Sequence, residues 1–442
     1  VGAKDINAFV GVGGPYFVES DGIDNDGDWV DTNGNGLVDP TDEGVDEAGE
    51  IDPVGAMGVT LQLEELALVM MKTVPDAVND PVYSYTALRA SGGAAIVGID
   101  DFVLEGQLDV AMNKADSVGN AVDFAASAAL NPSAFGSSEG LRVQTGTDPV
   151  NDFTVIDFNR ELTEVSGALT LQIAEYVYLR GEFAFSKTGP VDVTLSDGTI
   201  KEDLSVLKIG ASNVDAFVGV GGPYFVDQDG LDNDGDGEID EEGEIQADGA
   251  MGVVLSDLEI ALALFKPIVE KDANGQPTGT VDNSSYYALT ASGGVEVVGI
   301  DALTIRADIL TVAVNGGTDG IGDAANDPVI DFVQSADMDR VNNTTGELGA
   351  DGVKDNIDAF GSTEGIKIAT GTGDDDFEII SFESALLQAA GDVTLIIDGF
   401  VWASGKFAFS KGTIAQGTLE LENGDQPTGA FNLMTVGGSE IN

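Results

Sequence analysis

The feature that most constrains the fold of this chain is an internal repeat. Residues 8–18, AFVGVGGPYFV, recur without change at 216–226. A fixed order of returning segments is typical of repeat proteins, in which each unit buries its apolar face against its neighbours. Shorter segments also return in order, namely SGG at 91 and 292, VGID at 97 and 298, TGT at 145 and 370, and FAFSK at 183 and 407.

The repeat predicts where the chain divides. Two periods are expected, one at 8–215 and the other at 216–442. Residues 1–7, VGAKDIN, resemble both IGASNVD at 209–215 and VGGSEIN at 436–442. We therefore expect residues 1–7 to be the end of a preceding repeat, and the two periods to belong to a chain or assembly that continues.

Within each period, long segments alternate between apolar and polar side chains. Residues 176–187, YVYLRGEFAFSK, show this pattern, residues 400–411 repeat it, and 102–112 and 258–264 follow it too. Such alternation predicts strands with one buried face, because successive side chains of a strand point to opposite faces of the sheet. Residues 59–72 could also form a helix, but their counterpart in the second period alternates more cleanly, so we predict a strand.

These patterns predict an all-β protein. Recurring GG, DG and NG pairs supply the turns between strands. We expect an elongated, β-solenoid-like stack of strand-rich units, because stacking would cover strand edges that otherwise aggregate. Tandem β-sandwich domains are the alternative, since the units are long for a simple β-helix.

Two stretches rich in Asp, Asn and Gly interrupt the strand pattern, at 21–43 and 229–244. Acidic and amide oxygens spaced two residues apart around glycines are the ligands that Ca²⁺ needs from a loop. The alternative is that such clusters only form turns on a solvated surface. For the acids of a longer irregular insert, at 315–360, we favour a solvated loop. The predicted Ca²⁺ ligands are Asp24, Asp26, Asp28, Asp31, Asn33, Asn35, Leu37 (through its carbonyl), Asp39 and Asp42 in the first stretch, and Asp232, Asp234, Asp236, Glu238, Asp240 and Glu244 in the second.

The first stretch resembles known calcium loops. Residues 31–42, DTNGNGLVDPTD, fill the register of an EF-hand loop and end on Asp, as in bacterial dockerins. The preceding triplet of Asp24, Asp26 and Asp28 shares Asp31 with this loop, a chained arrangement that resembles thrombospondin type 3 repeats. As a whole, the sequence resembles the giant Ca²⁺-dependent repeat proteins of bacterial surfaces, the adhesins and matrix fibres. The resemblance implies Ca²⁺ as cofactor and an extracellular or cell-surface location.

Composition excludes several classes of function. The 442 residues include 18 basic and 78 acidic ones, which gives a net charge of −60. Nucleic acid and anionic membrane surfaces would repel such a chain, although a halophile-like surface could also account for the charge. The chain has no Cys and no His, which excludes thiol and imidazole catalysis and the usual zinc sites. Because no apolar run reaches the roughly 18 residues of a membrane helix, we expect no membrane span.

Together these observations favour a structural, non-enzymatic protein. We expect it to form or extend a fibre or adhesin stalk by joining with itself, end to end or laterally, while Ca²⁺ stiffens its loops. One alternative is a carbohydrate-binding module, with glycans as partners of an outward aromatic platform at Tyr176, Tyr178, Phe400 and Trp402. Another is a polysaccharide-active β-solenoid enzyme that uses paired carboxylates.

Overall fold

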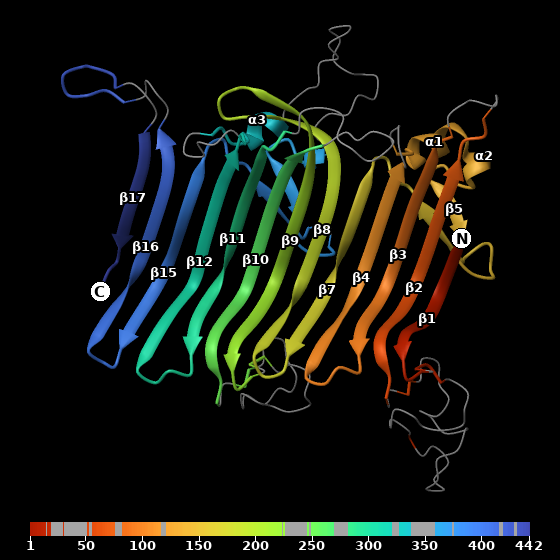
Figure 1. Ribbon diagram of the computed structural model, residues 1–442, viewed down its shortest axis with the longest axis horizontal. Helices are drawn as coiled ribbons and strands as arrows, with labels where there is room; N and C mark the ends of the chain where they lie inside the picture. Colours follow the sequence, from red (N-terminus) through yellow and green to blue (C-terminus); the bar gives the residue numbers. More distant parts are fainter. Residues whose placement is uncertain are drawn as a thin grey trace. The chain divides into compact units, whose positions relative to one another are not determined.

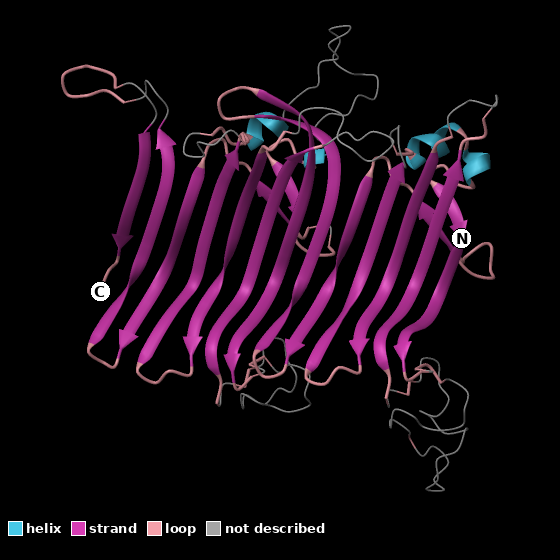
Figure 2. Cartoon of the chain, in the orientation of Figure 1, coloured by secondary structure: helices cyan, strands magenta, loops and turns pink. Residues whose placement is uncertain are grey.

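The computed structural model describes most of the chain, and strands dominate it (Figure 2). By contacts between their residues, the described parts form two compact units, unit 1 (Val1–Glu175) and unit 2 (Tyr176–Asn442). This division falls inside the first sequence period. That the two periods are separate structural repeats stays a prediction. The described residues are 1–14, 16–18, 30, 51–52, 55–75, 82–115, 121–222, 224–225, 245–246, 249–268, 282–320, 327–336, 359–373, 375–414, 419–427 and 431–442.

Unit 1 contains an antiparallel sheet whose strands lie side by side in their order along the chain, apart from two short strands that form a separate hairpin (Figure 1). A short turn at 98–101 connects two of its strands, and the backbone of both Gly98 and Asp101 has positive φ, which a tight turn often needs. The strands are β1 (Gly2–Val12), β2 (Met57–Lys72), β3 (Ser84–Val97), β4 (Phe102–Ala115) and β7 (Leu162–Ile173).

Unit 2 contains a longer sheet with the same antiparallel, neighbour-to-neighbour order. Its strands are β8 (Val177–Thr194), β9 (Ile200–Val220), β10 (Met251–Pro267), β11 (Ser285–Val298), β12 (Leu303–Thr318), β15 (Leu386–Ile397), β16 (Val401–Ile414) and β17 (Phe431–Ser439).

Each unit also has an excursion that leaves the sheet and packs back onto it. The excursion of unit 1 follows β4 and contains α1 (Phe124–Leu130), α2 (Pro132–Phe135), β5 (Leu141–Gln144) and β6 (Phe153–Ile156). The excursion of unit 2 follows β12 and contains α3 (Phe332–Ala336), β13 (Ile366–Ala369) and β14 (Phe377–Ile380). In both, the two strands form a hairpin.

The apolar core lies between each excursion and its sheet. In unit 1, Phe124 and Ile156 of the excursion are fully buried against Ala67 and Ala87 of the sheet. In unit 2, Phe332 and the hairpin isoleucines are buried against sheet residues that include Ala261, Ala263 and Ala288. Alanine on the sheet leaves room for the large side chains, each of which gains about 1.5–3 kcal/mol when fully buried.

A buried asparagine of the sheet forms hydrogen bonds with both ends of each excursion. The Asn113 side chain donates from Nδ2 to the carbonyl oxygens of Val122 and Arg160, both at 2.8 Å. The matching Asn315 donates in the same way to Ile330 at 2.9 Å and Ser384 at 3.0 Å. Buried carbonyls need such partners because leaving them unpaired costs about 1–3 kcal/mol.

The predicted all-β class with stacked strands is confirmed. What stacks within each unit is a series of strands, each antiparallel to the next sheet strand along the chain, while the hairpin strands stand apart from the sheet. The strand predicted at 59–72 is confirmed as β2, whereas the short helices were not foreseen. None of the described helices has the length and hydrophobicity that a membrane crossing requires.

The prediction of which face is buried was wrong in part. Tyr178, predicted to point outward, is 6% exposed, while Phe185, which the alternation places on the opposite face of the same strand, is 40% exposed. The reason is that other segments cover β8 and decide which of its side chains lose contact with water.

Candidate functional site

All predicted calcium ligands lie outside the described residues. This holds for the set from Asp24 to Asp42 and for the set from Asp232 to Glu244. Where the structure does describe Asp and Glu, they do not gather into any group of three or more that could hold a metal ion. Both flanks of each stretch are described, however, and they form what we call the loop bases.

The loop base of unit 1 joins the two flanks of residues 21–43. Phe17 and Ile51 form an antiparallel bridge, and the Asp52 N–H donates to the Tyr16 carbonyl oxygen at 2.7 Å. The Tyr16 ring stacks on Phe9 of β1, with ring centroids 5.4 Å apart, and meets Phe17 edge-on at 5.2 Å. Burial raises the pKa of the Tyr16 hydroxyl.

The loop base of unit 2 has the same construction. Phe225 bridges Ile245, and the Gln246 N–H donates to the Tyr224 carbonyl oxygen at 2.8 Å. Tyr224 stacks on Phe217 of β9 at 5.7 Å and meets Phe225 edge-on at 5.2 Å. Burial raises the pKa of the Tyr224 hydroxyl as well.

In unit 2 the loop base also covers a neighbouring strand. Tyr178 of β8 packs against Phe225 at 5.7 Å, within a buried cluster that includes Ala250 and Val254. Burial raises the pKa of the Tyr178 hydroxyl. The unchanged segment AFVGVGGPYFV is therefore the part of the repeat that closes the base of each acidic stretch, a role that sequence reasoning missed although the exact identity signalled it.

The turn of each hairpin lies against strands of its sheet. In unit 1, a Cβ on Gly2 would lie 2.0 Å from the Gln144 carbonyl oxygen. Lys4 Nζ donates to Asp152 Oδ1 at 2.7 Å, which lowers the pKa of Asp152 and raises that of Lys4. The hairpin thus needs glycine at position 2 in order to come this close.

The hairpin of unit 2 makes matching contacts on β8 and β9. A Cβ on Gly210 would lie 1.9 Å from the Ala369 carbonyl oxygen. The Ser212 hydroxyl donates to the Thr370 carbonyl at 3.1 Å, and the Thr372 N–H donates to Glu182 at 3.2 Å. We call β8 with β9 the covered copy, because the loop base and the hairpin both lie on it.

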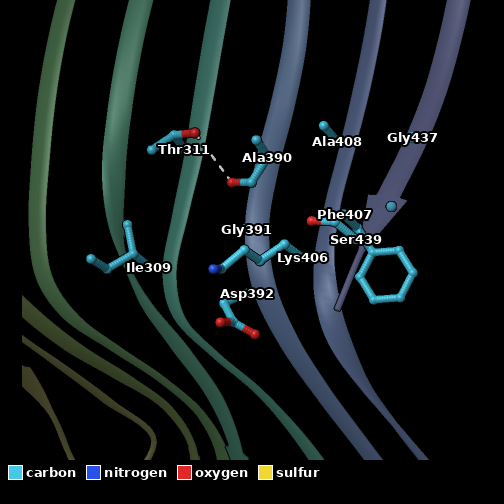
Figure 3. Close-up of a pocket in the computed structure, with 11 residues that line it drawn as sticks. Ile309, Thr311, Ala390, Gly391, Asp392, Lys406, Phe407, Ala408, Gly437 and Ser439 are labelled. Carbon is cyan, nitrogen blue, oxygen red and sulfur yellow. Dashed lines mark hydrogen bonds between the residues drawn. The ribbon is translucent and has the colours of Figure 1, made fainter. Parts of the chain in front are cut away.

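The same strand pattern returns in β16 and β17, which we call the bare copy. Gly437 matches Gly210, yet a Cβ there would meet no atom of the described residues within 4 Å. In its place is an open groove of about 510 Å³ (Figure 3). Lys406 and Phe407 of β16 border it together with residues of β12, β15 and β17.

Of the four residues of the predicted aromatic platform, the two in the bare copy are the most exposed. Phe400 and Trp402 are 87% and 71% exposed. Tyr178, which matches Trp402, is buried beneath Phe225, so Tyr178 does not belong to an outward platform. Tyr176 is half exposed.

One pair of carboxyl groups stands between the hairpin and the sheet of unit 2. Burial raises the pKa of Glu378 on β14, and a hydrogen bond and charge repulsion from Glu259 on β10 raise it further. The two groups can share a proton, but a directly hydrogen-bonded pair is closer than the two carboxyl groups of a glycoside hydrolase, which stand about 5 Å or more apart. The residues that border the groove at β16 include neither Glu378 nor Glu259.

The chain matches no known family model, no curated protein and no solved structure.

Proposed function

We propose that this chain is a structural repeat protein of the cell exterior, built to form or extend a fibre or stalk with further copies of itself. Ca²⁺ bound by the acidic stretches would stiffen it. In the absence of the cation, carboxylates such as Asp24, Asp26 and Asp28 repel one another. Binding turns this repulsion into ligation, so that folding and metal binding become linked.

The observation that carries the proposal is the repeated loop base. In both units a backbone hydrogen bond and an aromatic stack join the flanks of an acidic stretch. Closing the two flanks lowers the entropy that the stretch loses when it wraps around an ion. Neither loop base places a group that would act on a substrate, which favours a structural role over catalysis.

A chelation experiment tests the proposal. We expect excess EDTA to lower the melting temperature markedly, because an ion present at about 100 times its Kd contributes roughly 2.7 kcal/mol to stability. Asp236→Ala should reproduce part of the loss, whereas Asp197→Ala, in a described turn outside the acidic stretches, should not change the calcium dependence. A melting curve that is identical in EDTA and in excess Ca²⁺ would contradict the proposal.

A further inference from the structure

The sheet of unit 2 has two faces of different chemistry. Ala261, Ala263 and Phe265 of β10 belong to the core beneath the excursion, so they mark the covered face. Successive side chains of a strand alternate between the two faces, which places Leu262 and Leu264 on the other face. In Figure 1 the hairpin of β13 and β14, drawn in blue, lies behind the sheet strands, and the other face is turned toward the viewer. We call it the open face.

The open face is apolar along its strands. Residues paired across an antiparallel sheet share a face, so the register of the strands assigns their side chains. No Asp or Glu occupies a paired position of this face on β8, β9, β10, β11, β12 or β15, although the chain has 78 acidic residues. On β10 the face carries Val253, Leu255, Leu258, Ile260, Leu262 and Leu264.

The open face remains in contact with water. On the covered face, Phe217, Phe265 and Tyr286 are at most 2% exposed, whereas on the open face Val218 is 56% and Tyr287 45% exposed. Large exposed apolar surfaces mark interaction sites. The strands β8 to β12 and β15, about 4.8 Å apart and with about ten residues of about 3.4 Å each, give a face of about 1,000 Å². A stable interface needs about 800 Å² from each partner.

Opposite charges lie at the two ends of this face. Lys187 of β8 and Lys266 of β10 close its apolar rows at one end of the strands, and both are exposed. At the other end, the exposed Asp301 lies in the turn from β11 to β12, and the exposed Asp398 in the turn from β15 to β16. The acidic stretch at 229–244 connects β9 to β10 at this end too. The face is therefore complementary in charge to itself when it is turned end for end.

Unit 1, taken by itself, shows the same division. The apolar rows of β2 and β4, on the face opposite its excursion, are closed by Lys72 and Lys114. The turn from β3 to β4, at the other end of these strands, contains Asp100 and Asp101. Lysine at one end and Asp at the other is thus a feature of both units.

We propose that the open face of unit 2 packs on the same face of a second copy of this chain. The two sheets form a sandwich about 10 Å thick. A two-fold axis that runs across the strands uses the same surface of both copies, and it places Lys187 and Lys266 of each copy at the acidic end of the other. The inference rests on the proposed function in taking a second copy as partner, and it specifies the face and the orientation of a lateral contact.

A phospholipid surface fits the open face less well than a second copy does. Lipid phosphates would attract the lysines at one end, but Asp301, Asp398 and the acidic stretch would repel them at the other. A second copy offers opposite charge at both ends and apolar side chains between them.

Sedimentation velocity over a range of concentrations, in excess Ca²⁺, tests the contact. Val312 of β12 lies on the open face, and its neighbour Thr311 lies exposed on the other face. The wild-type chain should dimerise, and Val312→Asp should weaken dimerisation at least about tenfold, because a carboxylate between two apolar sheets loses its hydration. Thr311→Asp, in the same strand, is the matched control and should leave dimerisation nearly unchanged. A wild-type chain that stays monomeric at every concentration, or equal losses in both variants, would overturn the proposal.

A charge exchange tests the orientation and changes only exposed side chains, so it does not depend on whether Val312→Asp folds. One variant combines Lys187→Glu with Lys266→Glu, and the other combines Asp301→Lys with Asp398→Lys. Each variant alone should dimerise weakly, because like charges then meet at both ends. An equimolar mixture should recover the wild-type affinity, since opposite charges meet again at both ends. A mixture no tighter than the separate variants would reject the end-for-end orientation.

This inference and the proposed function can fail separately. A dimer whose melting temperature is the same in EDTA and in Ca²⁺ would retain the sheet contact and reject the calcium-stiffened role. A monomer whose melting temperature depends on Ca²⁺ would do the reverse. A monomer that floats with phosphatidylcholine vesicles would assign the open face to lipid and overturn the inference.

Discussion

The covered copy and the bare copy have the same strand pattern but differ in the segments that pack on them. FAFSK occurs in both β8 and β16, yet Tyr178 is buried and Trp402 is exposed. The difference arises from the segments that lie on the strand, since the loop base and the hairpin turn cover β8 and β9. Exposure along these strands is therefore set by neighbours that come from far along the chain, and less by alternation within the strand.

Aromatic truncation should give the largest difference between the copies. Tyr178→Ala removes a buried ring from the cluster around Phe225 and should cost about 3 kcal/mol of unfolding free energy. Trp402→Ala should change it by no more than about 0.5 kcal/mol in the monomer. Urea denaturation at low protein concentration measures both, and equal costs would show that the two positions do not differ as described.

Glycine substitution should give a smaller difference of the same sign. Gly210→Ala forces a Cβ against the Ala369 carbonyl and should cost about 1–3 kcal/mol. Gly437→Ala adds a Cβ in open space and should be neutral or slightly stabilising. The same denaturation experiment applies, and a destabilised Gly437→Ala monomer would mean that the groove is filled in solution.

The smallest expected effect concerns the carboxyl pair beneath the hairpin of the covered copy. Because the folded pKa of Glu378 is raised, the folded state binds a proton more readily than the unfolded state. This contribution to stability grows as pH falls through the folded pKa and levels off below the unfolded value near 4.5. Glu378→Gln should therefore raise the melting temperature slightly at pH 7 and leave it nearly unchanged near pH 4.

Glu364→Gln, which alters an exposed carboxylate near the hairpin, is the control for this experiment. If both variants change the melting temperature alike at both pH values, the effect would come from the general acidity of the chain and not from the half-buried pair of Glu378 and Glu259.

Much of the fold could be predicted from sequence because a strand's pattern is local. The alternation in 176–187 and 400–411 correctly indicated β8 and β16, and the second-period counterpart correctly decided that 59–72 is a strand. What covers each strand could not be predicted in the same way. Tyr178 and Trp402 stand at equivalent positions in similar patterns, and only a contact with Phe225, far along the chain, separates them.

The sequence led to a prediction of calcium ligands in the acidic stretches, but it did not lead to the loop bases. Spacing of Asp and Asn drew attention to 21–43 and 229–244, because side-chain oxygens are what Ca²⁺ binds. The hydrogen bond from Asp52 to the Tyr16 carbonyl involves only backbone atoms and leaves no signature of its own in the sequence. The unchanged aromatic run was the one available signal, and its meaning depends on contacts between segments.

The buried asparagines have a consequence for how this chain can change over time. The more distant carbonyl that Asn113 binds belongs to a residue 47 positions along the chain, and the one that Asn315 binds lies 69 positions along. Each side chain binds the first and the last part of its excursion at one point. Residues inserted between these two parts can therefore leave the sheet strands on either side unchanged. The excursions are thus the places where insertions should be tolerated without a change in the sheet, both in evolution and in the engineering of added domains.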